Sequence, residues 1–176
     1  MSYRDEIVKA MNMLGENPRT IFIGQNVVYS GATTVHETLK DIPADKKIEL
    51  PVMEDVQMGI SIGLALEGFI PVSIYPRMDF LMLAMNQLVN HLDKIEEMSC
   101  GRFKPKVIIR TCVGSTKPLH PGPQHSQDHT SGVDFLLQTI EVVRLTRAER
   151  IMPAYKRAME TDHSTVLVEL SENMRD

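Results

Sequence analysis

The sequence predicts an α/β fold, in which a doubly wound, mostly parallel sheet has helices on both faces. Short apolar runs typical of strands alternate with longer segments of helical periodicity. The run at 106–113 is almost continuously apolar, as in a strand that helices cover on both sides. The length of 176 residues suits one domain, so we expect residues 1–176 to form a single unit.

The first predicted elements are a helix and a strand. Residues 5–14 place apolar side chains at helical spacing, and Gly15 ends that pattern. The run at 20–27 is rich in β-forming residues and is the first predicted strand. A polar segment at about 38–47 separates it from residues 48–52, which lead into the next helix.

Two helices and a strand come next. The segment at 54–67 carries apolar residues on one face, and Gly68 fits its end. Residues 71–76 form a strand with a proline at each end. A long helix is predicted over about 78–98, because its apolar residues recur at helical spacing.

The strand at 106–113 is followed by a loop at 114–132 that is rich in Gly, Pro, His and Ser. A strand at 141–146, a helix at 148–161 and a strand at 164–170 complete the chain. Connections in compact domains usually have about 4–6 residues, so this longer loop is expected to be functional. It leaves the carboxyl end of a parallel strand, which is where ligands bind in open α/β sheets.

Composition limits the classes of function. The 19 Lys and Arg residues against 23 Asp and Glu give a net charge of −4, so neither nucleic acid nor a membrane is expected as a partner. No apolar stretch reaches the ~20 residues that span a bilayer, and the N-terminus lacks the core of a signal peptide. Cys100 and Cys112 are not spaced as zinc ligands and are expected to be reduced thiols. We therefore expect a cytoplasmic protein.

Glu54 and Asp55 stand at the start of a predicted helix. From spacing alone, compensation of the helix dipole, worth about 0.3–1 kcal/mol, ranks above a catalytic role for Glu54. Gly59 and Gly63 lie in the same helix, where each glycine costs up to about 1 kcal/mol relative to alanine. This pair of glycines indicates close contact with another helix or strand.

The long loop contains His120, His125 and His129. Three histidines can form a catalytic zinc site, but no carboxylate or cysteine stands at a familiar ligand spacing, and no metal site is predicted. The sequence support for a nucleophile pair of His125 and Ser126 is weaker still, because the GxSxG elbow is missing. The remaining interpretation is a histidine that transfers protons to a bound substrate.

Arg110 and Phe80 are further candidates. Arg110 lies near the end of the most apolar strand, where its partner is either a substrate anion or a structural carboxylate. Phe80 lies off the stripe formed by Met78, Met82 and Met85, so it has a chance to face a pocket, although core packing is the default. The glycines form no phosphate-binding motif.

Five segments occur in a characteristic order: IFIGQNVVYSG, PVMEDVQMGISIGLALEGFIPV, MDFLMLAMNQLVNHLDKIEEMSCG, PKVIIRTCVG and GPQHSQ. Together they resemble the pyrimidine-binding domain of thiamine diphosphate enzymes of the transketolase and 2-oxo acid dehydrogenase group. The similarity covers nearly the whole chain. It is greatest to the N-terminal half of the β subunit of a 2-oxo acid dehydrogenase's decarboxylating component, and it implies the transketolase-type pyrimidine-binding fold.

The resemblance implies roles for three side chains. It places Glu54 where the family keeps a glutamate that hydrogen-bonds the aminopyrimidine ring of the cofactor and so promotes formation of the ylid. It implies that Phe80 stacks on that ring and that His125 faces the substrate and transfers protons. Gln127 belongs to the same HSQ triplet, and we expect His125, Gln127 and Arg110 to bind the substrate.

Two positions depart from the family pattern. Pro121 stands where transketolases carry an acidic residue, which favours the dehydrogenase branch, and Arg77 stands where an aromatic residue is usual. The sequence has no GDG…N motif, with which the family holds Mg²⁺ and the diphosphate, and it ends without the C-terminal domain of the typical β subunit. We therefore expect an α-type partner subunit that holds Mg²⁺ and the diphosphate, in an α₂β₂ assembly. Self-association through the helix of Gly59 and Gly63 is expected, with packing inside one chain as the alternative.

The leading hypothesis is a β-type subunit of a split thiamine diphosphate enzyme that cleaves or forms a C–C bond next to a carbonyl. It is most like a 2-oxo acid dehydrogenase or decarboxylase component, and it is expected to be inactive alone. One alternative is the C-terminal-type half of a split transketolase. An alternative of another class is a non-catalytic scaffold subunit. A metal hydrolase built on the histidine loop ranks last.

Overall fold

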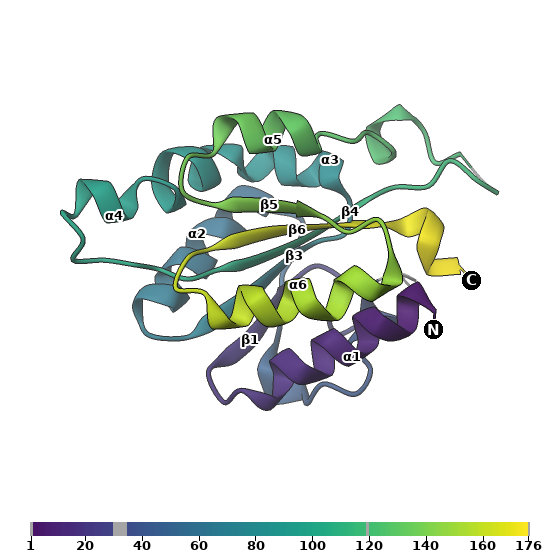
Figure 1. Cartoon of the computed structure of the whole chain (residues 1–176), viewed down its shortest axis with the longest axis horizontal. Coiled ribbons are helices and arrows are strands. Elements are labelled where there is room, and N and C mark those ends of the chain that lie inside the picture. The colour runs from purple at the N-terminus through teal and green to yellow at the C-terminus, as the bar shows by residue number, and fades with distance from the viewer. Residues whose placement is uncertain (1, 30–34, 119, 176) are drawn as a thin grey trace.

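In the computed structural model, which describes residues 2–29, 35–118 and 120–175, helices lie on both sides of a central sheet (Figure 1). Six strands form this sheet in the described residues, in the order β2-β1-β3-β4-β6-β5. The strands are β1 (Thr20–Gly24), β2 (Lys47–Glu49), β3 (Ile70–Tyr75), β4 (Ile108–Val113), β5 (Glu141–Arg144) and β6 (Thr165–Leu170). Every neighbouring pair is parallel, which confirms the predicted α/β class and makes the sheet fully parallel.

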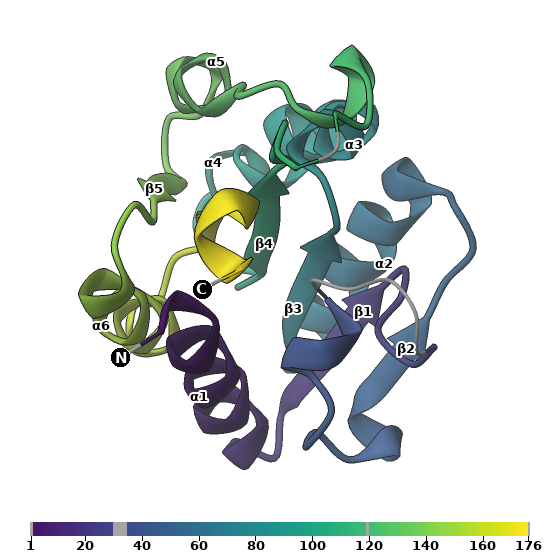
Figure 2. The same ribbon diagram turned by 90° about the vertical axis from the view of Figure 1, so that its right-hand side faces the viewer.

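The helices form two layers, one on each face of the sheet (Figures 1 and 2). They are α1 (Tyr3–Glu16), α2 (Glu54–Leu66), α3 (Met78–Leu81), α4 (Ile95–Met98), α5 (Thr130–Leu136) and α6 (Ala148–Glu160). Helices α1 and α6 pack on one face over a core that includes Phe22 and Ile108. Helices α2 to α5 cover the other face, over a core that includes Tyr75 and Ile109. Among the described residues, no helix is both long enough and apolar enough to cross a membrane.

The long helix predicted over 78–98 is wrong as a single element. After α3 the chain forms a 3₁₀ turn at Met82–Ala84 and π-helical turns at Asn86–Leu92 before α4 begins. The backbone N–H of Asp93 donates to the carbonyl of Leu88, five residues earlier, at 3.0 Å. The buried Asp93 carboxylate then accepts the backbone N–H of Gln138 and of Thr139, at 3.1 and 2.8 Å. Widened turns keep the apolar face toward the sheet, so apolar periodicity does not reveal them.

Several other boundaries differ from the predicted ones. The first strand ends at Gly24, and the segment near 48–52 contributes the short edge strand β2. The predicted loop at 114–132 ends earlier, because α5 begins at Thr130. Val133 is the one fully buried residue of α5, so the sequence carries too weak an apolar pattern to predict this helix.

The strand order places a topological switch point between β1 and β3, at the carboxyl edge of the sheet, which faces the viewer in Figure 2; we call this position the β1–β3 crevice. From β1 the chain runs outward to β2, whereas from β3 it runs in the opposite direction to β4. Ligands bind at such switch points in open α/β sheets. Gly24 ends β1 at this point with a φ of +155°, and a Cβ atom there would lie 2.4 Å from the carbonyl oxygen of Ile74 in β3, so only glycine fits.

Candidate active site

Glu54 is the first residue of α2 and lies beside the crevice between β1 and β3. Its side chain is only 3 % exposed, and its Oε1 accepts a hydrogen bond from Gln25 Nε2 at 3.3 Å. No other hydrogen bond reaches this carboxylate from the described residues, so Oε2 is left for a donor on a ligand. Helix-dipole compensation does not require burial, and a buried carboxylate with one neutral donor is costly. The burial of Glu54 therefore favours a functional role over the capping role that ranked first from spacing.

A chain of buried polar groups joins the start of α2 to β3. The Tyr75 hydroxyl donates to the backbone carbonyl of Glu54 at 3.5 Å, and Ser73 Oγ donates to the Tyr75 hydroxyl at 3.3 Å. Gln57 Nε2 donates to Ser73 Oγ at 3.2 Å and to the carbonyl of Ile74 at 3.0 Å. Burial raises the pKa of Tyr75 above its ordinary value, so its hydroxyl remains a neutral donor. These contacts fix Glu54 relative to the end of β3.

The segment after β1, which carries Gln25, is held by the last residue of β2. The Glu49 carboxylate accepts the backbone N–H groups of Asn26, Val27 and Val28 at 2.7, 2.8 and 2.8 Å. Three charge-assisted hydrogen bonds make this a firm anchor for an irregular segment. Glu49 thereby sets the position of the donor to Glu54, a role that its place in a polar run did not predict.

Phe80 and His125 meet at the ends of β3 and β4. Their ring centroids are 5.3 Å apart and the rings are inclined by 85°, so the contact is edge-to-face. Phe80 lies on α3, directly after β3, and His125 ends the 3₁₀ turn Pro123–His125 in the long loop. Both side chains are half-buried. The structure thus brings together two predicted site residues that are far apart in the sequence.

Asp79 and Gly114 hold the loop of His125 in place. Asp79 Oδ1 accepts hydrogen bonds from Gln127 Nε2 at 2.9 Å and from the Gln127 backbone N–H at 3.4 Å. Asp79 Oδ2 is enclosed and has no hydrogen-bond partner among the described residues. A Cβ atom on Gly114 would lie 1.7 Å from the carbonyl oxygen of His125, so only glycine permits this crossing. Gln127, predicted to bind substrate, has its amide N–H engaged in positioning this loop.

Glu54 does not contact the pair of Phe80 and His125 directly. No hydrogen bond, ion pair or ring contact joins them within the described residues. Phe80 and His125 follow β3 and β4, and Glu54 accepts a hydrogen bond from Gln25, which follows β1, so all three lie at the same edge of the sheet. The arrangement presents a carboxylate, an aromatic ring and an imidazole along the carboxyl edge of the sheet.

Arg110 is removed from the predicted substrate-binding residues. Its side chain is 2 % exposed, and it donates to both carboxylate oxygens of Glu169 at 2.8 and 2.9 Å and to Thr38 Oγ1 at 2.8 Å. Tyr155 also donates to Glu169, at 2.6 Å. Side chains alternate along a strand, and Arg110 points to the α1 and α6 face, away from Glu54. Of the two partners expected from sequence, the structural carboxylate is the one present.

Among the described residues, the side chains of the histidine loop are not arranged as a metal site or as a Ser–His pair. Within the described residues, no group of three or more His, Cys, Asp or Glu side chains is placed to hold a metal ion. His120 Nδ1 accepts the backbone N–H of Gly122 at 3.0 Å. Ser126 Oγ donates to the carbonyl of Gly122 at 3.2 Å and not to His125. The metal-hydrolase and Ser–His interpretations therefore lose their geometric basis.

Gly59 and Gly63 do not pack within the described part of the chain. A Cβ atom at either position would meet nothing within 4 Å. Val56 and Ile60, on the same helix, are 47 % and 38 % exposed. Among the described residues, close packing inside one chain therefore does not explain the two glycines, and Val56 and Ile60 leave an exposed apolar face on α2.

The chain is similar in sequence to a known protein family and to named proteins. A family model described as the pyrimidine-binding domain of transketolase matches residues 1–175. The chain is 28 % identical over 172 residues to the mitochondrial pyruvate dehydrogenase E1 component subunit beta of Caenorhabditis elegans, covering 96 % of this chain and 48 % of that one. It is 32 % identical over 126 residues to the corresponding subunit beta of Gracilaria tenuistipitata var. liui, covering 70 % and 38 %.

Solved structures agree on the fold. One, described as a split-gene transketolase in an inactive beta4 tetramer, has a TM-score of 0.74 at 20 % identity and covers 97 % of this chain and 51 % of its own. A transketolase from Campylobacter jejuni has a TM-score of 0.73 at 15 % identity, covering 97 % and 26 %. The chain thus spans about half the length of these relatives, or less.

Proposed function

The chain belongs to the transketolase pyrimidine-binding domain family, and on this premise we propose that it is the pyrimidine-binding subunit of a split thiamine diphosphate enzyme. The enzyme cleaves or forms a C–C bond next to a carbonyl, most like the decarboxylating component of a 2-oxo acid dehydrogenase, in keeping with its relatives by sequence. The observation that carries the proposal is the buried Glu54 carboxylate in the β1–β3 crevice, with Oε2 lacking a donor from the described residues.

The donor set of the crevice fits an aminopyrimidine ring. Glu54 offers an acceptor for a ring nitrogen, and half-buried Phe80 offers an apolar surface for the ring. When bound, thiamine diphosphate supplies the carbon nucleophile that adds to a carbonyl. Glu54 would orient the ring and hold a proton at its nitrogen, and His125 would transfer a proton at the substrate, because an imidazole can act as a general acid or base. Asp79 and Gln127 hold His125 in position.

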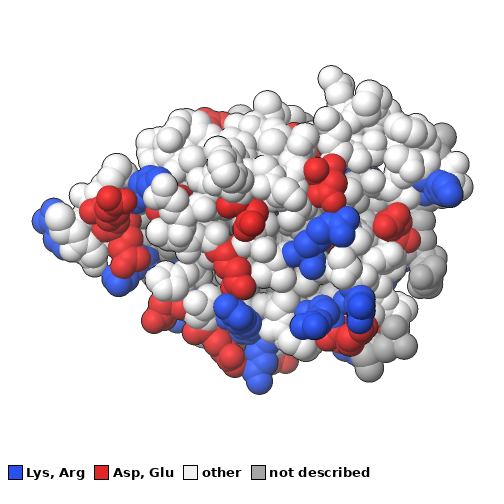
Figure 3. Space-filling model, turned by 45° about the horizontal axis from the view of Figure 1, so that its top comes forward, with Lys and Arg blue, Asp and Glu red and all other residues white. Residues whose placement is uncertain are grey.

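We assign Mg²⁺ and the diphosphate to an α-type partner subunit. The relatives by sequence carry the name of a beta subunit, which supports an assembly of unlike chains. The face over α3 and α5 carries few charged side chains (Figure 3) and exposes Phe135 by 88 % and Leu83 by 62 %. Exposed apolar patches of this kind mark interaction surfaces, so this face is suited to the partner.

We further propose that two copies of the chain associate through α2. The open positions at Gly59 and Gly63 admit the close approach of a second helix, and Val56 and Ile60 supply apolar contact. Ile60→Asp is expected to abolish self-association in sedimentation velocity, because it places a charge in the interface. Leu83→Asp, which alters an exposed apolar residue on another element, is the control and should leave the sedimentation coefficient unchanged. Equal behaviour of the two variants would contradict the α2 interface.

The functional test uses the chain co-expressed with a protein that carries the GDG…N motif. Glu54→Gln keeps the shape of the side chain and removes its proton exchange, so turnover should fall by about 10²-fold or more while the complex still assembles. Asp55→Asn, in the same helical turn but exposed, should retain activity within about twofold of the native complex. Thiamine diphosphate affinity, measured by calorimetry, should weaken in Glu54→Gln but not in Asp55→Asn.

The substrate decides between the alternatives. Turnover of pyruvate with an artificial electron acceptor supports the 2-oxo acid reaction, whereas turnover of xylulose 5-phosphate supports a split transketolase. A complex that assembles but neither binds the cofactor nor turns over either substrate would identify a scaffold subunit. Full activity of Glu54→Gln would refute the assignment of Glu54.

A further inference from the structure

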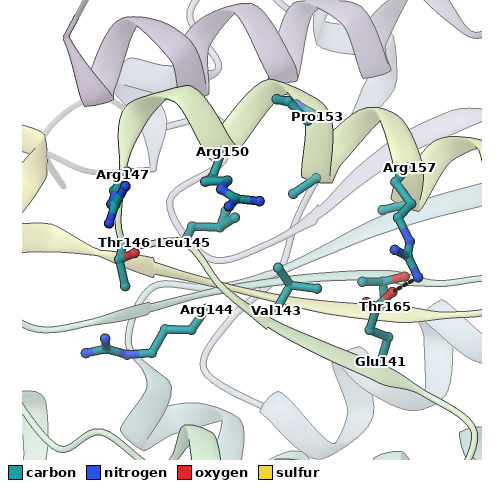
Figure 4. A pocket seen from close by; sticks show the side chains of 12 residues that line it. Glu141, Val143, Arg144, Leu145, Thr146, Arg147, Arg150, Pro153, Arg157 and Thr165 are labelled. Atoms are coloured by element: carbon teal, nitrogen blue, oxygen red, sulfur yellow. Dashed lines mark ion pairs between the residues drawn. The ribbon is translucent and has the colours of Figure 1, made fainter.

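A basic groove lies between β5 and α6, far along the sheet from the β1–β3 crevice (Figure 4). Its volume is about 560 Å³, within the ~300–1,000 Å³ that small-molecule sites usually occupy. The arginines that line it are Arg144, Arg147, Arg150 and Arg157, against one acidic residue, Glu141. The groove is therefore locally positive in a chain whose net charge is −4.

In the part of the chain that the structure describes, two of these arginines form close ion pairs with carboxylates, and the other two do not. Arg144 is paired with Asp128 at 2.9 Å, and Arg157 with Glu141 at 3.1 Å. Arg147 lies 3.8 Å from Glu149, and both of these side chains are exposed, so this pair is weak. Arg150 has no ion-pair partner within the described residues. The unneutralised charge thus gathers at the end of the groove where α6 begins.

Arg147 and Arg150 both line the groove at the start of α6, with Arg147 at its outer end and Arg150 beneath the helix (Figure 4). Arg147 is also the N-cap residue of α6, and no side chain caps the helix, so its first backbone N–H groups add to the positive potential. Val143, Pro153 and Ala154 form an apolar wall beside the arginines. A ligand that fits has a compact anionic group at one end and an apolar body at the other.

We propose that this groove binds a small organic phosphate. Its phosphate group lies between Arg147 and Arg150, because the guanidinium fork matches phosphate oxygens in paired hydrogen bonds. Its body rests on Val143 and Ala154. The site is separate from the β1–β3 crevice and does not depend on the function proposed for that crevice.

The test titrates the full chain with phenyl phosphate, inorganic phosphate and tetraglutamate at constant ionic strength, followed by ¹⁵N–¹H NMR. Phenyl phosphate should bind saturably, shift the amide signals of residues 145–150, and bind more tightly than inorganic phosphate because of the apolar wall. Arg150→Gln should weaken its binding by about tenfold or more, since hydrogen bonds between charged groups are lost. Ala154→Glu should do the same by placing a carboxylate in the groove. Arg102→Gln, an exposed arginine after α4, is the control and should have no effect.

Each other outcome overturns the proposal. Binding that Arg150→Gln leaves intact would mean that the groove is not the site. Tetraglutamate binding as tightly as phenyl phosphate would point to an acidic protein segment instead. Absence of saturation in the native chain would exclude a phosphate site altogether.

Discussion

Replacing Glu169 by glutamine should strongly destabilise the fold, because it leaves the buried charge of Arg110 without a counter-charge. Arg110 and Glu169 are 2 % and 1 % exposed, and Glu169 accepts hydrogen bonds from Arg110 and Tyr155. Burial disfavours the guanidinium charge, but the charge of Glu169 outweighs burial and holds the pKa of Arg110 above its ordinary value. Removing one partner of such a pair costs about 3–5 kcal/mol, a large share of the ~5–15 kcal/mol that stabilises a typical domain.

Urea unfolding followed by circular dichroism measures this loss. With a slope of about 2 kcal/mol per molar urea, the midpoint of Glu169→Gln should fall by about 2 M. The double variant Arg110→Met/Glu169→Leu removes both charges and should recover most of the lost stability. Glu160→Gln breaks the exposed pair with Lys156 and should cost no more than about 0.5 kcal/mol. A loss below about 1 kcal/mol in Glu169→Gln, or a double variant no more stable than the single one, would refute this reasoning.

Three further predictions concern a thiol, a carboxylate and a glycine. Burial, with the nearby charge of a glutamate, raises the pKa of Cys112 to about 12, so Ellman's reagent at pH 8 should label only Cys100 in the folded chain and both thiols in urea. Burial alone would raise the pKa of Asp93, but hydrogen bonds from its lysine and threonine neighbours outweigh burial, so the pKa lies below its ordinary value. Asp93 therefore stabilises the fold above the ordinary carboxylate pKa of about 3.9, and in urea unfolding the deficit of Asp93→Asn should shrink as the pH falls below that value. Gly114→Ala should displace His125, seen as a changed ring-proton NMR shift; an unchanged shift would contradict the loop crossing.

The fold was largely predictable because its signals are local. Strands with apolar residues on both faces and helices with one apolar face are recognisable within a few residues, and their alternation implies a parallel sheet. The break in the long helix was not predictable, because the acceptor role of Asp93 depends on backbone groups at 138–139. The sequence did not identify the partner of Arg110 for the same reason, because Glu169 lies far along the chain and only strand register brings the two side chains together.

The candidate site was predictable in part. Glu54, Phe80 and His125 were identified by resemblance, and spacing alone ranked Glu54 as a helix-start acid. The contact of Gln25 with Glu54 was not predicted, because a polar residue after a strand is usually an ordinary turn residue. Asp79 was missed because an acid at a helix start has a sufficient local explanation in the dipole. In each case the informative feature is a contact between segments that are distant in sequence.

The buried charge pair and the crevice occupy different surfaces of one sheet, and this separation bears on how the protein tolerates change. Arg110 and Glu169 lie beneath α1 and α6, whereas Glu54 lies at the start of α2 on the other side. Substitutions without shared partners generally combine additively. Substitutions around Glu54 should therefore leave the folding free energy that the Arg110–Glu169 pair contributes largely unchanged, and the reverse should also hold.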